Sequence, residues 1–176
     1  MQQFSVQKID VSKIYNGETN EIPFSFDFSP ADTQNMDLFF PEPVNVSGRV
    51  YEKARGKNRA ESYVELEFSI KGFFDTHCAR CSCDLKKEFC FDRVYGISKK
   101  LVNESDEYIE VPDGLLDIEE LAESVFYLEL PTKVLCKDDC KGLCPVCGCD
   151  LNYKECGCKR NIGANTLEEL KKLLDK

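Results

Sequence analysis

The sequence lacks tryptophan, has a single histidine and contains no long apolar run. One histidine per chain excludes metal sites that need several imidazole ligands from the same chain. No stretch approaches the roughly 18 consecutive apolar residues that a membrane-spanning helix requires. The N-terminus lacks the basic start and the apolar segment of a secretory signal peptide. Together these absences predict a cytoplasmic protein that makes no use of a membrane.

Positive charge is also in the minority. The 176 residues include 23 Lys and Arg against 32 Asp and Glu, which gives a net charge of −9. Nonspecific binding to nucleic-acid phosphates requires clustered excess positive charge, so the chain as a whole is not suited to it. The sequence also contains no Gly-rich phosphate loop, no His-based dyad and no Gly-x-Ser-x-Gly elbow. We therefore expect a binding protein without a small-molecule substrate rather than an enzyme.

Cysteine, in contrast, is abundant, with eleven in the chain. Cytoplasmic thiols stay reduced, so cysteines there are more typical of metal ligands than of disulfides, and an odd number cannot pair completely. Eight of the cysteines form four close pairs, and two such pairs complete a closed tetrahedral zinc site. The pairs are Cys78/Cys81, Cys136/Cys140, Cys144/Cys147 and Cys156/Cys158. They predict two structural zinc ions, although an iron–sulfur cluster or a redox-active pair would use the same thiols.

The spacing leaves the grouping of these pairs open. The preferred assignment places Cys144/Cys147 and Cys156/Cys158 on one ion, since they come from one local loop. The pairs Cys78/Cys81 and Cys136/Cys140 then bind the other ion. A crossed assignment would put Cys78/Cys81 and Cys156/Cys158 on the same ion. Three cysteines remain outside the pairs, namely Cys83, Cys90 and Cys149. Cys83 and Cys149 each follow a ligand candidate by two residues, so they could compete as alternative ligands.

Alternating apolar and polar residues predict strands over most of residues 1–75 and over 85–95. The alternation is clearest at 64–70, which is typical of a strand with one buried face. The polar, basic stretch 54–60 predicts a hairpin with a long exposed tip. No internal repeat is evident.

A capping box of Asp117 and Glu120 predicts a helix that ends before Pro131, and a second box predicts a C-terminal helix. The whole pattern predicts an α+β fold, in which a mostly antiparallel, barrel-like sheet packs against a helix and a Cys-rich zinc-binding segment follows. We expect a β-rich core domain with one helix at 1–135, a metal-binding module at 136–160 and a C-terminal helix at 161–176.

Two basic residues near the cysteines are candidates for binding a partner. Arg80 lies inside Cys78-Ala-Arg-Cys81, where it could bind a phosphate or a partner's carboxylate, or simply be solvated. Lys141 lies in the Cys-rich module, where five basic residues stand against four acidic ones over 136–160. This small excess is a weak signal for nucleic-acid binding.

The ordered set of motifs resembles the bacterial YceD family, named for large ribosomal RNA subunit accumulation. The resemblance rests on Cys78-Ala-Arg-Cys81 at the end of a strand, on the helix that opens at Asp117 and closes in Leu128-Glu-Leu-Pro131, and on Cys136-Lys-Asp-Asp-Cys140 with the Cys-rich tail to Cys158. It implies a cytoplasmic, non-enzymatic factor that supports 23S rRNA accumulation and assembly of the large ribosomal subunit.

The resemblance also implies the partner, a precursor of the large ribosomal subunit. Because the chain is acidic, a basic ribosomal protein suits it at least as well as 23S rRNA itself. Two alternatives from other classes are a redox or iron–sulfur protein and a zinc-stabilised protein–protein adaptor unrelated to ribosomes.

Overall fold

The computed structural model describes residues 8–30, 37–53, 63–98 and 108–158. The chain forms two compact units. The sheet unit comprises Met1–Thr76 and Lys86–Thr132, and the cysteine unit comprises His77–Leu85 and Lys133–Lys176. The predicted domain boundaries stay predictions. The predicted hairpin tip at 54–60 and the predicted helix at 161–176 lie outside the described residues.

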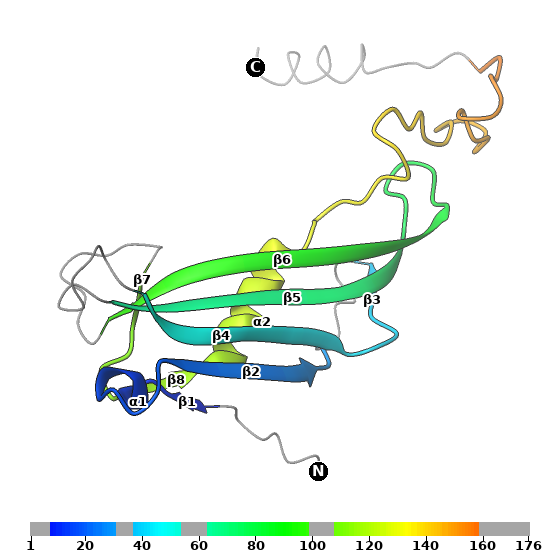
Figure 1. The fold of residues 1–176 in the computed structure, drawn as a ribbon. Coiled ribbons are helices and arrows are strands. Elements are labelled where there is room, and N and C mark those ends of the chain that lie inside the picture. The colour runs from blue at the N-terminus through cyan, green and yellow to red at the C-terminus, as the bar shows by residue number, and fades with distance from the viewer. Residues whose placement is uncertain (1–7, 31–36, 54–62, 99–107, 159–176) are drawn as a thin grey trace, which may run out of the picture. The chain divides into compact units, whose positions relative to one another are not determined.

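The sheet unit is built on a six-stranded sheet (Figure 1). Its main path runs through β2 (Glu21–Phe28), β4 (Val44–Lys53), β5 (Tyr63–His77), β6 (Asp84–Ser98) and β7 (Tyr108–Glu110), with β3 (Leu38–Phe39) paired to β5. The pairs β2/β4, β4/β5 and β3/β5 are antiparallel, whereas β6 and β7 run parallel. A separate antiparallel pair joins β1 (Lys8–Asp10) to β8 (Leu115–Asp117).

The expected barrel-like sheet is wrong, because the described strands leave the sheet open. The two ends of its path are β2 and β7, which do not pair with each other. A barrel requires its end strands to meet with enough length to bond, and β7 has three residues. The sheet is also mixed rather than purely antiparallel. Alternation in a sequence specifies which face of a strand is buried, but it does not specify which strands become neighbours.

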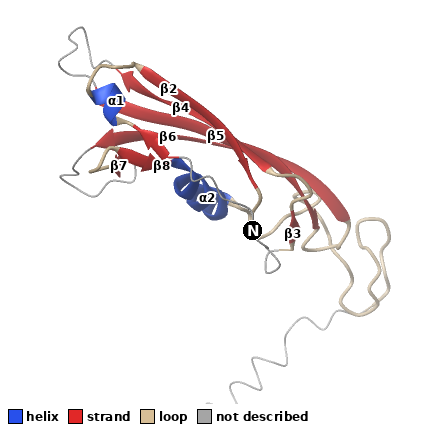
Figure 2. Cartoon of the chain, turned by 90° about the horizontal axis from the view of Figure 1, so that it is seen from below, coloured by secondary structure: helices blue, strands red, loops and turns tan. Residues whose placement is uncertain are grey.

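Figure 2 shows the helix α2 (Ile118–Glu129) on one face of the sheet. The buried side chains of α2 and of the strands form the core on this face. The inward residues of β5 are buried, as the alternation at 64–70 predicts.

The N-terminus of α2 forms as the capping box predicts, since the Glu120 N–H donates to the Asp117 carboxylate at 3.1 Å. Phe126 of α2 is fully buried, and its ring centroid lies 5.3, 5.4 and 5.8 Å from those of Phe28, Phe40 and Phe89. A short helix, α1 (Ser12–Tyr15), completes the described part of this unit.

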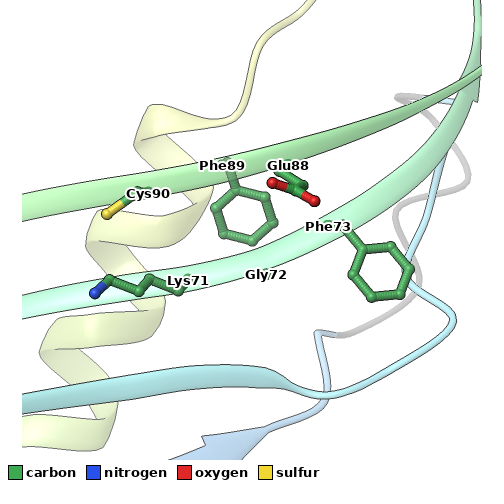
Figure 3. A pocket seen from close by; sticks show the side chains of 6 residues that line it. All are labelled: Lys71, Gly72, Phe73, Glu88, Phe89 and Cys90. Carbon is green, nitrogen blue, oxygen red and sulfur yellow. The ribbon is translucent and has the colours of Figure 1, made fainter.

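A shallow hollow of about 480 Å³ lies between β5 and β6 (Figure 3). Gly72 leaves room that the ring of Phe89 occupies, because a Cβ atom at Gly72 would lie 2.9 Å from the tip of that ring. Charged side chains of opposite sign, Lys71 and Glu88, border the hollow. The close packing at Gly72 therefore fixes β6 against β5.

Candidate metal centre

Two loops of the cysteine unit share one backbone conformation. Knuckle 1, Cys78–Cys83, connects β5 to β6, and knuckle 2, Cys144–Cys149, is closed by a bridge between Leu143 and Asp150. In each knuckle the N–H of the first cysteine donates to the carbonyl of the last, at 2.9 and 2.8 Å. The N–H of the fifth residue donates back to the carbonyl of the first, at 2.9 and 2.8 Å.

The fifth residue of each knuckle has a left-handed backbone, with φ of 57° at Ser82 and 71° at Gly148. Glycine adopts this conformation without steric cost, whereas serine does so only where its surroundings enforce it. Both knuckles carry the spacing Cys-x2-Cys-x-Cys. We found no repeat in the sequence, although this shared spacing is the signal that could have revealed one.

Five thiols gather around knuckle 1. The sulfurs of Cys78, Cys81, Cys83 and Cys136 all lie within 4.8 Å of one another. Cys140 joins them, because its Sγ lies 3.8 Å from that of Cys78. The Sγ of Cys81 lies 3.7 Å from that of Cys136 and 3.4 Å from that of Cys83. The four residues predicted for this site therefore lie together, with Cys83 as an additional thiol.

The second group forms around knuckle 2. It consists of Cys144, Cys147, Cys156 and Cys158, whose sulfurs also lie within 4.8 Å of one another. Cys156 and Cys158 therefore lie with Cys144 and Cys147, as in the preferred assignment, and not with the cysteines of knuckle 1. Cys149 is a further thiol beside this group. Burial and its hydrogen bonds with the thiols of Cys147 and Cys156 raise its pKa to about 12.

Backbone N–H groups of the knuckles stabilise the thiolate form of their first cysteines. Burial opposes the ionisation of Cys78, but N–H donors from Cys81, Arg80 and Cys136 outweigh it and lower its pKa to about 5. In knuckle 2, the N–H groups of Cys147 and Val146 lower the pKa of Cys144 to about 6. Since the thiolate is the form that binds a metal, each loop favours the ionised form of its first cysteine. Neighbouring thiols act in the opposite direction on other cysteines of the groups, and burial and the thiols around it raise the pKa of Cys136 to about 11.

The arrangement fits a tetrahedral ion held by sulfur. A Zn–S bond of about 2.3 Å places the sulfurs of a regular tetrahedron about 3.8 Å apart. The separations Cys78–Cys140 and Cys81–Cys136 match this edge. None of the eleven cysteines forms a disulfide. Each group could therefore hold one metal ion, and the all-sulfur donor set is compatible with zinc.

Arg80 and its neighbours join the two parts of this unit. The Arg80 guanidinium donates to the carbonyl of Cys140 at 2.8 Å, and the Arg80 carbonyl accepts from the Leu143 N–H at 3.0 Å. The backbone of Lys141 donates to the side chain of Asn152, which also donates to the Cys140 sulfur. The one histidine, His77, lies beside Asp84, with 3.2 Å between Nε2 and the carboxylate. Arg80 thus has an internal contact that the sequence did not reveal.

We expect Gly142→Ala to weaken metal retention. Gly142 has a φ of 72°, and a Cβ atom there would lie 2.9 Å from the Arg80 carbonyl oxygen. The strained backbone and this contact together cost about 1–3 kcal/mol. Competition with a coloured zinc chelator measures the loss. Gly148→Ala is the matched control, because Gly148 has the same φ range but no neighbour within 4 Å. Equal losses in the two variants would contradict a role for the Arg80 contact.

Comparison with known proteins gives one match. A family model described as "Large ribosomal RNA subunit accumulation protein YceD" matches residues 66–174, more than half of the chain. The matched range begins in β5 and includes α2 and both knuckles. No curated protein and no solved structure matches the chain. Among the described residues, no helix is long and apolar enough to cross a membrane.

Proposed function

The chain belongs to the YceD family, and from this we propose that it supports 23S rRNA accumulation and assembly of the large ribosomal subunit in the cytoplasm. It acts by binding and not by catalysis. The observation that carries the proposal is the family match across residues 66–174, which takes in both thiol groups.

Two zinc ions serve this function structurally. A site closed by four thiolates leaves no coordination position for a reacting water, which suits a stabilising role rather than a catalytic one. In the described part of the cysteine unit, loops predominate, and its buried cluster consists of Cys78, Cys81 and Cys140. Metal ions at the two groups would fix these loops in the shape that the partner recognises.

A basic ribosomal protein on the subunit precursor is the partner that the charge favours. The chain carries a net charge of −9, and opposite charge accelerates and orients association. Each four-thiolate zinc site adds two further negative charges. Arg80 and Lys141 are both exposed. They are proposed to contact carboxylates of this ribosomal protein or phosphates of the rRNA in the same precursor.

Depletion of the protein in its native host tests the proposal. We expect the ratio of 23S to 16S rRNA to fall and the intact gene to restore it. A gene carrying Cys78→Ser and Cys81→Ser should fail to restore it, whereas Cys90→Ser, which changes a cysteine outside both groups, should restore it fully. An unchanged ratio after verified loss of the protein would contradict the proposal.

A further inference from the structure

One side of β6 is a long edge that, among the described residues, a strand covers only at its C-terminal end. On one side it pairs with β5, and on the other side β7 pairs only with Gly96–Ser98. Within the described residues, no strand therefore covers Lys86–Tyr95 on that side. The other end of the sheet is β2, which contains Pro23, a residue that cannot donate a backbone hydrogen bond. The exposed edge of β6 has no proline and can accept another strand.

The backbone polar groups of alternate residues point toward this open edge. Ser98 directs its carbonyl to the β7 side, where it accepts from the Val111 N–H at 2.8 Å. Backbone groups alternate in direction along a strand, so the even-numbered residues of β6 direct theirs to the same side. These include Lys86, Glu88, Cys90 and Asp92, all of which are exposed. Figure 3 shows Glu88 and Cys90 on this strand, on either side of Phe89.

We infer that this edge binds the same edge of a second copy of the chain, antiparallel, with Phe89 opposite Phe89. In this register Lys86 of each copy lies opposite Asp92 of the other, and the two-fold symmetry makes the ion pair twice. Lys87 then lies opposite Phe91, and Glu88 opposite Cys90. The result is one continuous sheet through both copies.

The charges on β6 favour this register over its neighbours. Centring the pair on Cys90 would place Lys87 opposite Arg93 and Glu88 opposite Asp92, so like charges would meet. Centring it on Glu88 would place Asp84 opposite Asp92, and centring it on Phe91 would form no ion pair. Centring it on Lys87 would place Lys86 opposite Glu88 but would also place Lys87 opposite Lys87. Of the registers centred on residues 87 to 91, the one on Phe89 forms ion pairs without bringing like charges together. This self-complementarity points to a second copy rather than an unrelated peptide.

The side chains of the proposed ion pair already lie on the outer face of the sheet. Lys86 Nζ lies 3.6 Å from the centroid of the Phe73 ring, and the Asp92 carboxylate accepts from the Ser69 hydroxyl. These contacts hold both charges on the face opposite α2. Because Phe73 and Ser69 belong to β5, both side chains would turn on this face toward the open edge to meet a second copy, which leaves the core unchanged.

Charge exchange tests the inference in the full, metal-loaded chain. Lys86→Glu places two carboxylates in each cross-strand pair, and Asp92→Lys places two ammonium groups there. We expect wild-type protein to sediment as a dimer and each variant to dissociate with a Kd about tenfold higher or more. An equimolar mixture of the two variants should recover a dimer that holds one copy of each. Lys13→Glu, which changes an exposed lysine on α1, is the control and should leave the dimer intact.

Three outcomes would overturn the inference. They are a monomeric wild-type chain at all concentrations, a dimer that neither charge change weakens, and variants that fail to recover a mixed dimer. Because recovery in the mixture requires both variants to be folded, it separates a lost interface from a lost fold. The rRNA ratio after depletion does not depend on this interface, so the two proposals can fail separately.

Discussion

Removal of bound metal is expected to unfold the cysteine unit and leave the sheet unit folded. Structural zinc supplies an apparent stabilisation of about 10–16 kcal/mol in small zinc-dependent modules. The buried cluster of the cysteine unit consists of Cys78, Cys81 and Cys140, packed against two leucines and Cys136. In the sheet unit the described residues include one cysteine, Cys90, and the core is made of aliphatic and aromatic side chains. A chelator therefore acts on one unit and spares the other.

Hydrogen exchange with and without a chelator measures this effect. Amides in 78–83 and 133–158 should lose their protection, while those of β4 and β5 up to Ile70 keep it. The untreated protein should contain two zinc ions per chain and be colourless. Unchanged protection after verified metal loss would contradict the structural role of the metal, and a brown protein with iron would contradict zinc.

Single-cysteine variants resolve which of the five thiols around knuckle 1 bind the metal. Cys140 is buried and accepts a hydrogen bond from Asn152, whereas Cys83 is exposed. The Cys83 sulfur lies 3.4 Å from that of Cys81, which is closer than the sulfur–sulfur edge of about 3.8 Å in a regular zinc tetrahedron. Cys140→Ser should therefore lower the content from two zinc ions to one, and Cys83→Ser should retain both. The reverse result would make Cys83 the fourth ligand and Cys140 the spare thiol.

Local features of the fold could be predicted from the sequence because they depend on neighbouring residues. The cap at Asp117 needs only a carboxylate and an N–H three residues later. The buried face of β5 follows from its alternation. The gathering of Cys144, Cys147, Cys156 and Cys158 depends on the short loop that contains all four.

Features that depend on distant residues could not be predicted in the same way. The open sheet results from the parallel pairing of β6 with the short β7, which no local pattern encodes. Arg80 contacts Cys140 across 60 positions of the chain, so its role within the unit is invisible in the motif Cys78-Ala-Arg-Cys81. Cys83 joins the thiol group because the left-handed turn at Ser82 directs the chain back toward Cys81.

Phe126→Ala is expected to destabilise the sheet unit by about 3–5 kcal/mol, the usual cost of removing a large buried aromatic side chain. Phe126 is fully buried, and its ring meets those of Phe28, Phe40 and Phe89, which come from three separate segments of the chain. The truncated side chain would leave a cavity between α2 and the sheet. The ring contacts of Phe126, which hold α2 against the sheet, would be lost with the side chain.

Urea unfolding followed by far-UV circular dichroism measures this loss, and Leu128→Ala is the matched control on the same helix. Leu128 is 84% exposed, so its truncation should change stability by no more than about 0.5 kcal/mol. Equal effects of the two changes would contradict the packing of α2 on the sheet. Zinc content should stay at two ions per chain in both variants, because the ligands belong to the other unit. A loss of metal in Phe126→Ala alone would instead show that the cysteine unit needs a folded sheet unit to hold its ions.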